Sequence, residues 1–384
     1  MENSMIIMSK VISKLGLEID KSGYTKCPLC DVGKKKKRLN ININKGVFRC
    51  AACSTSGDGV TLYGWLKYGI DPEMLKSKSS TDAQKRKQAR AKLLSEIDSS
   101  VSGYVNPKHY TQSVAKEPPI ADLIERDRTY GFMLNRLNLK SEHYNNLINR
   151  GLRRSDIIRN GYKSVPEDIN GIVKSLRQED AAVLTGVPGF LKKKEGGWDL
   201  AYSKSGFYIP VRDISSDFYK SPFGKIQGLQ IRYDSVKEGE QRYKWLSSRN
   251  YDDKRYSEGY AAQTYTHFVG YPEKEVIITE GPLKSDIICR FLDVPVLGIP
   301  GVNSIKHLTP HLQKLGDLGV RKYKIAFDMD IYENVNVQKA LKNLIDLLKG
   351  MNLEIDFIQW PREYKGFDDY LLAIYLQNGN RLDI

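Results

Sequence analysis

Val276-Ile277-Ile278-Thr279-Glu280-Gly281 decides the fold, because a run of β-favouring apolar residues ends there on a carboxylate and a glycine. Lys324-Ile325-Ala326-Phe327-Asp328-Met329-Asp330 repeats this arrangement with two carboxylates, and Lys365-Gly366-Phe367-Asp368-Asp369 adds two more after a third such run. The carboxyl ends of parallel strands meet at one edge of a sheet, where α/β folds bind their ligands. We therefore expect these carboxylates to gather in one crevice.

Strands and helices alternate around these stretches, which predicts a parallel sheet with helices on both faces. The expected strands cover residues 276–279, 296–299, 323–327 and 353–358. The expected helices cover residues 284–292, 304–315, 335–349 and 367–377. The third of these helices has an apolar stripe at helical spacing and is closed by Gly350.

Two regions of different composition precede this α/β segment. Residues 119–273 combine helical patterns with the strand patterns 206–211, 226–233 and 242–246, which predicts a mixed α+β subdomain. Residues 71–118 are rich in cations and then in Ser and Pro, as in a flexible basic linker that holds one helix. The charge of that helix fits a solvated face or a nucleic-acid contact. The expected domains are therefore 1–70, 71–118, 119–273 and 274–384.

The charge of the chain narrows its class of partners. The 384 residues carry a formal net charge of +14, and such a basic surface attracts polyanions, which favours nucleic acid over a basic protein without such a partner. No stretch approaches the roughly 18 apolar residues that span a bilayer, so no membrane association is expected. Residues 1–16 lack the apolar core of a secretion signal, which favours the cytoplasm.

Four of the five cysteines form two Cys-x-x-Cys pairs. Cys27-Pro28-Leu29-Cys30 and Cys50-Ala51-Ala52-Cys53 are 19 residues apart, a spacing typical of two zinc knuckles in a zinc ribbon. All four ligands come from the protein, so the expected zinc ion is structural. The alternative is two redox-active or buried thiol pairs. Cys289 lies among apolar residues of an expected helix and is predicted to be a core residue.

Cations and aromatic residues lie near this cysteine module. Residues 34–38 supply five cations at the start of an expected hairpin over residues 38–48, and Phe48, Tyr63 and Trp65 follow. Charge that holds phosphates and rings that stack on bases would make a reader of single-stranded nucleic acid. The alternative, favoured for Phe48 and Trp65, is that the rings belong to the core.

The carboxylates at the strand ends predict a cation site. Glu280, Asp328 and Asp330 would repel one another in one crevice unless cations bind there, and their oxygen atoms suit Mg²⁺ or Mn²⁺. Two such ions can activate a 3′-hydroxyl and stabilise a leaving pyrophosphate. Lys284, one helical turn beyond Glu280, would either meet a phosphate or remain a solvated lysine at the helix start.

These motifs resemble two known domains. Glu280-Gly281 and Asp328-x-Asp330, in their strand–helix context, resemble the TOPRIM domain, a Rossmann-like fold of bacterial-type primases, topoisomerases and some nucleases. The cysteine module with Ser56-Gly57-Asp58-Gly59-Val60 is similar to the zinc-binding domain of bacterial and phage primases. That family often has Cys-His-Cys-Cys, whereas Cys30 takes the second position here. The combination resembles zinc-ribbon TOPRIM primases of phages or mobile elements.

The resemblance implies a DNA primase, a DNA-directed RNA polymerase that makes short RNA primers from NTPs on single-stranded DNA by divalent-metal-dependent nucleotidyl transfer. It assigns the Mg²⁺ or Mn²⁺ ligands to Glu280, Asp328 and Asp330. It adds a third catalytic motif, which comprises Lys365, Asp368 and Asp369. For template or nucleotide binding it indicates Arg232, Arg242, Lys244 and Gln230. It also indicates Lys284, for which a solvated lysine at the helix start remains the alternative.

Two other functions remain open. A TOPRIM nuclease would use the same carboxylates to hydrolyse a phosphodiester, and a DNA-binding replication accessory protein would keep the fold without the reaction. No Gly-x-x-x-x-Gly-Lys-Ser/Thr phosphate loop occurs in the sequence, so ATP-driven unwinding is not expected of it. A separate replicative helicase in the cytoplasm of a bacterial host cell is a candidate partner.

Overall fold

The structure is a computed structural model. It describes residues 2–20, 22–30, 37–76, 83–98, 119–179, 182–201, 203–215, 218, 223–238, 240–248, 253–299, 305, 308–329 and 335–379. The chain divides into two compact units, Met1–Ala115 and Lys116–Ile384. Each unit is described by itself below. Among the residues that the structure describes, no helix has the length and apolarity that crossing a membrane requires.

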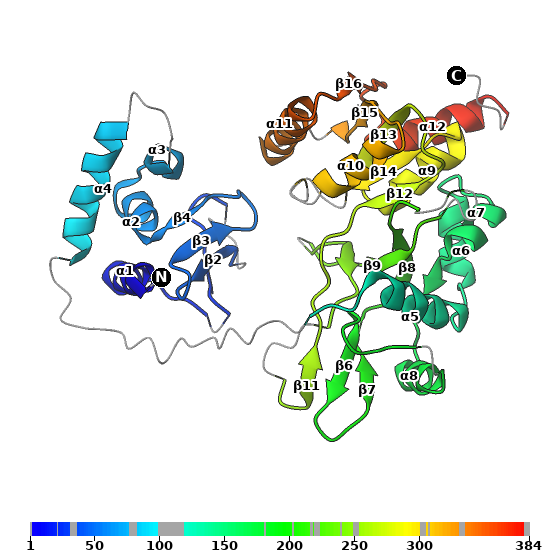
Figure 1. Ribbon diagram of the computed structural model, residues 1–384, viewed down its shortest axis with the longest axis horizontal. Helices are drawn as coiled ribbons and strands as arrows, with labels where there is room; N and C mark the ends of the chain where they lie inside the picture. Colours follow the sequence, from blue (N-terminus) through cyan, green and yellow to red (C-terminus); the bar gives the residue numbers. More distant parts are fainter. Residues whose placement is uncertain are drawn as a thin grey trace. The chain divides into compact units, whose positions relative to one another are not determined.

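The first unit combines an antiparallel sheet with helices (Figure 1, blue to cyan). Its sheet has the order β1-β2-β3-β4, with β1 Tyr24–Thr25, β2 Leu39–Asn42, β3 Val47–Cys50 and β4 Ser56–Asp58. Its helices are α1 Glu2–Leu15, α2 Gly59–Tyr68, α3 Pro72–Lys76 and α4 Ala83–Asp98. Strands β2 and β3 form the expected hairpin.

One face of this sheet builds the core of the first unit. Leu39 and Ile41 of β2 are buried, whereas the intervening asparagines are half-buried, as the period-2 pattern predicts. Phe48 and Trp65 are buried and stack with ring centroids 5.7 Å apart. These two rings therefore belong to the core, and the alternative in which they stack on bases does not apply to them.

Helix α4 packs into this unit, although the sequence suggested a connecting segment there. Its Leu93 and Ile97 are buried in the same core as the cysteines. Arg90 pairs with Asp58, which caps the N-terminus of α2. Lys87 and Lys92 remain exposed. The apolar pair at i and i+4 explains the docking, because it gives an otherwise charged helix one face that a core can bury.

The second unit begins with helices and two antiparallel sheets (Figure 1, green). The helices are α5 Leu123–Asn135, α6 Ser141–Ile148, α7 Arg154–Asn160 and α8 Ile169–Arg177. One sheet, β10-β9-β8-β5, contains β5 Lys163–Ser164, β8 Gly206–Arg212, β9 Ile226–Tyr233 and β10 Tyr243–Trp245. The other, β11-β6-β7, contains β6 Phe190–Lys193, β7 Trp198–Leu200 and β11 Tyr256–Gly259.

Strand β9, which carries the candidate binding residues Gln230 and Arg232, is buried on both faces along its whole length. Leu229 and Ile231 pack in one core cluster with Tyr208 of β8. The other face of β8, through Phe207 and Ile209, packs in the cluster that also holds α9 and α12. Strands β8 and β9 therefore form a layer within the second unit, whereas Tyr243 and Lys244 of the neighbouring β10 are exposed.

The C-terminal part of the second unit is a five-stranded sheet of order β12-β14-β13-β15-β16. Its strands are β12 His267–Val269, β13 Glu275–Glu280, β14 Val296–Ile299, β15 Lys322–Ala326 and β16 Glu354–Phe357. Its helices are α9 Pro282–Leu292, α10 Thr309–Asp317, α11 Val335–Gly350 and α12 Phe367–Gln377. The four expected strands are parallel, and β12 adds an antiparallel edge that the sequence did not reveal.

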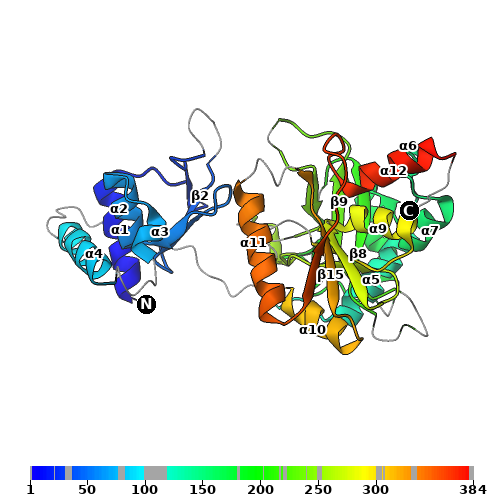
Figure 2. The same cartoon turned by 90° about the horizontal axis from the view of Figure 1, so that it is seen from above.

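Helices cover both faces of this sheet, as the sequence predicts (Figure 2). Ile278 of β13 and Ile325 of β15 pack with α10 and α11 on one face. Ile277 and Ala326, one residue along each strand, pack with α9 and α12 on the other. Strands β13 and β14 are accordingly largely apolar, whereas charged residues alternate with apolar ones along β15 and β16.

Candidate functional site

The four expected zinc ligands meet in the first unit. The Cys27 and Cys53 sulfur atoms are 3.7 Å apart, and those of Cys30 and Cys50 are 3.3 Å apart. All four sulfur atoms lie within 4.8 Å of one another. A tetrahedral zinc ion with Zn–S bonds of about 2.3 Å sets its sulfur ligands about 3.8 Å apart. The cluster therefore fits a structural zinc ion.

The surroundings of these cysteines favour a bound cation. Cys27 and Cys50 are buried, and burial raises the pKa of the Cys27 thiol to about 11. A divalent cation is what keeps such buried thiols deprotonated. The backbone N–H of Ala52 donates to the Cys50 sulfur at 3.4 Å, which orients this ligand. A disulfide framework is not formed, because all five cysteines are free.

The carboxylates of the second unit line a cleft of about 700 Å³ at the carboxyl ends of β13 and β15. Glu280 is the last residue of β13, and Asp328 follows β15 by two residues. Asp368 and Asp369 lie in the first turn of α12. The backbone N–H of Met329 donates to the carbonyl of Lys365 at 2.9 Å, which joins the end of β15 to the start of α12.

Most of the site residues that the sequence suggested line this cleft. They are Glu280, Asp328, Lys365, Asp368, Asp369, Lys284, Lys244 and Gln230. Arg232 and Arg242 are not among the lining residues, and Asp330 lies outside the described residues. Arg150 also lines the cleft, and no pattern of charge or spacing marked it. It follows α6 by two residues and reaches the site only through the tertiary fold.

Arg232 and Arg242 have different surroundings. Arg232 is only 6% exposed, and its guanidinium lies 5.6 Å from the centroid of the Phe207 ring. Burial lowers the pKa of Arg232. Arg242 is exposed. Gln230, on the same face of β9 as Arg232, does reach the cleft.

Lys284 contacts a carboxylate of the cleft, which excludes the solvated lysine considered above. Its Nζ donates to Oδ1 of Asp328 and lies 3.5 Å from Oδ1 of Asp368. Burial alone would lower the pKa of the Lys284 ammonium, but the charges of Asp368 and Asp328 outweigh burial and raise it. Lys284 is therefore a charged partner of these two carboxylates.

Asp368 supplies a buried oxygen that suits a cation. Its carboxyl group is 3% exposed, and among the described residues its Oδ1 has no hydrogen-bond partner. Burial raises the pKa of Asp368, although Lys284 opposes the rise. A Cβ atom on Gly366 would come within 2.8 Å of Lys284 Nζ and 3.3 Å of Asp328 Oδ1, so glycine leaves space at this point. The donor set thus fits a hard divalent cation.

The carboxylate oxygen atoms of the cleft lie farther from one another than the four cysteine sulfur atoms do. Among the described residues, the groups of three or more metal-ligand atoms within 4.8 Å are the four cysteines and a set of Glu142, His143 and Asp234. The latter set is explained without an ion. His143 Nε2 lies 3.0 Å from Asp234 Oδ1, and its Nδ1 lies 2.6 Å from the Ser164 hydroxyl, so both ring nitrogens have partners.

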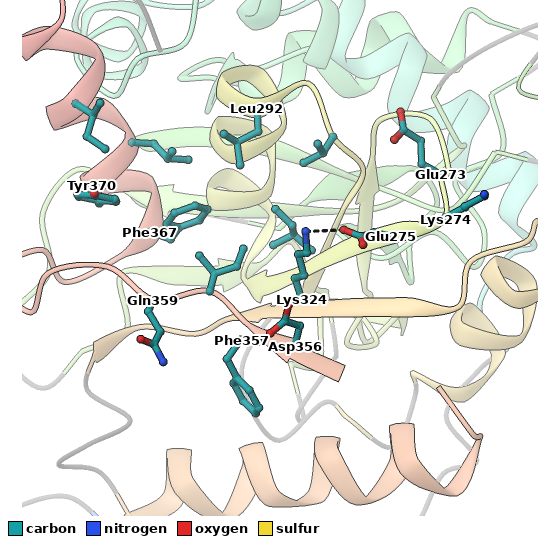
Figure 3. A pocket seen from close by; sticks show the side chains of 15 residues that line it. Glu273, Lys274, Glu275, Leu292, Lys324, Asp356, Phe357, Gln359, Phe367 and Tyr370 are labelled. Carbon is teal, nitrogen blue, oxygen red and sulfur yellow. Dashed lines mark hydrogen bonds and ion pairs between the residues drawn. The ribbon is translucent and has the colours of Figure 1, made fainter. Parts of the chain in front are cut away.

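A larger cavity, about 1040 Å³, lies elsewhere on the same sheet (Figure 3). Leu292 of α9 and Phe367 and Tyr370 of α12 form its apolar wall. Its floor carries Glu275 and Lys324, whose charged atoms are 2.5 Å apart. Glu273 and Asp356 also line this cavity, but the carboxylates at the carboxyl ends of β13 and β15 line the cleft, so we place the candidate site in the cleft.

Residues 265–375 match a family described as a domain of unknown function (DUF3854). No curated protein matches the chain.

Among solved structures, the chain is similar to the zinc-binding and RNA polymerase domains of the Aquifex aeolicus primase, at 15% identity and a TM-score of 0.46, over 98% of this chain and 82% of that one. It is also similar to the RNA polymerase domain of Mycobacterium tuberculosis primase DnaG, at 13% identity and a TM-score of 0.45, over 67% and 79% of the two chains. The primase fragment of the bacteriophage T7 primase-helicase protein matches at 13% identity and a TM-score of 0.35, over 69% and 77%. At these values we argue the function from the residues of the site themselves.

Proposed function

We propose that this protein is a DNA primase, which synthesises short RNA primers on single-stranded DNA by divalent-metal-dependent nucleotidyl transfer, and that residues 274–384 form its TOPRIM catalytic domain. The observation that carries the proposal is the cleft, where Glu280, Asp328 and Asp368 come together from three elements beside cationic side chains. Carboxylates for a divalent cation and cations for phosphates are the groups that nucleotidyl transfer requires.

Glu280 and Asp328 would hold Mg²⁺ or Mn²⁺, with Asp330 as a further ligand and Asp368 and Asp369 adjoining. When bound, this cation would supply activation of a 3′-hydroxyl and stabilisation of the leaving pyrophosphate. The buried Oδ1 of Asp368 supports the assignment, because it has no hydrogen bond among the described residues and its ion pair with Lys284 is long, at 3.5 Å, so a closer cation would stabilise it. Lys365 also lines the cleft and would contact the negatively charged phosphates of the nucleotide.

The remaining polar residues of the cleft would bind and orient the substrates. Arg150 and Lys244 line it together with Gln230. Their side chains would donate charge-assisted or neutral hydrogen bonds to the nucleotide triphosphate and the template backbone. Arg242, exposed and outside the lining, would contact template phosphates beyond the cleft. Buried Arg232 would act through packing beneath the site and would not bind nucleotide directly.

The first unit would hold the template strand. Lys37, Lys45 and Arg49 are exposed there and offer charge for phosphates. Residues Lys34, Lys35 and Lys36 of the basic run lie outside the described residues. The structural zinc ion would keep these strands in place without taking part in the chemistry. Opening of duplex DNA would come from a separate replicative helicase, since the sequence contains no phosphate loop.

The test is a synthesis assay. The purified protein is incubated with single-stranded DNA, labelled ribonucleotides and Mg²⁺ or Mn²⁺, beside an Asp328→Ala/Asp330→Ala variant. We expect short labelled products from the intact protein and none from the variant, with DNA binding retained by both. A shortened template without a new strand would replace the proposal by a nuclease. DNA binding without either reaction would leave a replication accessory protein.

A further inference from the structure

Lys284 lies where a cation of the cleft would be expected. Its ammonium contacts Asp328 and is 3.5 Å from the Oδ1 of Asp368, an oxygen with no hydrogen-bond partner among the described residues. Any cation that bridged these two carboxylates would occupy the same space. The ammonium thus already fills the position that a divalent ion would take between β15 and α12.

The position of Lys284 in α9 shows what holds it there. It lies in the first turn of the helix, at the positive end of the helix dipole, and that turn contains no acidic residue. A lysine at this position is unfavourable unless carboxylates outside the helix compensate for it. Asp328 and Asp368 provide that compensation, because the ammonium contacts the first carboxylate and lies 3.5 Å from the second.

The charges along the cleft balance one another. Its described lining holds four carboxylates, Glu280, Asp328, Asp368 and Asp369. The same lining holds four cations, Arg150, Lys244, Lys284 and Lys365. Asp330 lies outside the described residues and is not in this count. Lys284 forms ion pairs with two of these carboxylates, Asp328 and Asp368, and so compensates their charge directly.

We propose that the Lys284 ammonium replaces one of the two divalent cations, so that the cleft binds a single Mg²⁺ or Mn²⁺ at Glu280 and Asp328. This inference deepens the proposed function and rests on it. The positive charge of a lysine is always present in the protein, whereas a second ion would have to bind from solution. Lys284 therefore acts as a positioning residue for Asp328 and Asp368, and the phosphates are left to the other cations of the cleft.

The number of bound ions tests this inference directly. Full-length protein with its zinc retained is titrated with Mn²⁺, and free Mn²⁺ is measured by electron paramagnetic resonance. We expect one Mn²⁺ per wild-type chain and two per Lys284→Met chain, because the substitution leaves Asp328 and Asp368 without their ammonium. A Lys244→Met variant removes a cation of the same cleft that contacts neither carboxylate, and it should keep one Mn²⁺. Two ions in the wild type, or no second ion in Lys284→Met, would overturn the inference.

A double variant identifies the second site. In Lys284→Met/Asp368→Asn the count should return to one, because the added ion needs both carboxylates. If thermal melting shows that Lys284→Met is unfolded, Lys284→Gln replaces it in the same series. The synthesis assay is run in parallel. Primer synthesis with two ions in the wild type would overturn this inference and leave the proposed primase function intact. The expected ion counts without primer synthesis would support the inference and overturn the primase function.

Discussion

In the four-cysteine cluster the ligand atoms already lie within 4.8 Å of one another, whereas in the acidic cleft an ammonium lies between the carboxylates. Cys50 is the last residue of strand β3, and Cys30 and Cys53 lie on turns. The carboxylates come from β13, β15 and α12 and are balanced by side chains of their own cleft. The first arrangement suits an ion that stays bound, and the second suits an ion that must exchange during a reaction.

The largest expected effect is on the cluster that we consider structural. Cys50→Ser should lose the zinc ion and with it the fold of the first unit, because structural zinc contributes about 10–16 kcal/mol of apparent binding free energy to such domains. Zinc content and protease sensitivity of residues 1–115 measure the loss. Cys289→Ser, which changes a thiol of α9 in the second unit, is the matched control. Stoichiometric zinc in Cys50→Ser would contradict the assignment.

The next largest effect concerns the acidic cleft, where the bound ion must exchange during the reaction. Asp328→Asn should lower primer synthesis by more than about 100-fold, since it removes a direct ligand, and changes to groups that only orient such ligands already cost about 10–100-fold. Although the substitution is isosteric, it removes the charge that pairs with the largely buried Lys284, so the melting temperature should fall and synthesis is measured at a temperature where both proteins are folded. Asp356→Asn makes the same chemical change on β16, in the cavity of Figure 3, and should retain full synthesis. Equal rates for the two variants would remove Asp328 from the active site.

A smaller effect is expected from crowding the cleft. Gly366→Ala would place a Cβ atom 2.8 Å from Lys284 Nζ and 3.3 Å from Asp328 Oδ1. Displaced catalytic groups should slow synthesis by about 10–100-fold with little change in folding. Gly350→Ala, at the end of α11, is the control because a Cβ atom there meets nothing within 4 Å. Unchanged synthesis in Gly366→Ala would show that the cleft tolerates movement of these side chains.

The smallest effect tests the docking of α4. Arg90→Ala removes the ion pair with Asp58, and because both side chains are partly exposed the cost should stay below about 1 kcal/mol. Burial would raise the pKa of Asp58, but its hydrogen bonds with Arg90 and Thr61 lower it below 3.8. The pair therefore stabilises the unit above that pH and is lost as the pH falls further. Chemical denaturation of wild type, Arg90→Ala and the exposed control Lys87→Ala measures the difference. A cost of several kcal/mol would mean that α4 is held mainly by this pair.

The parts of the fold that the sequence could predict depend on the spacing of residues that are close together in the chain. Two Cys-x-x-Cys pairs identified a cluster that the structure assembles, and apolar runs that end on Glu280 and Asp328 identified two parallel strands and one cleft. Edge strand β12 was missed because three residues are too few to show a period. The burial of Arg232 was missed because period 2 gives the face of a strand but does not show what packs against it.

By itself, the sequence predicted the four-cysteine cluster, the four parallel strands and the carboxylates that follow two of them, because each depends on residues only a few positions apart. Only the tertiary structure decided that Arg150 joins the cleft, that α4 belongs to the first core and that Lys284 pairs with Asp328 and Asp368. Lys284 is separated from these carboxylates by 44 and 84 positions. Contacts across such distances depend on how the sheet and its helices pack, which no local pattern of residues encodes.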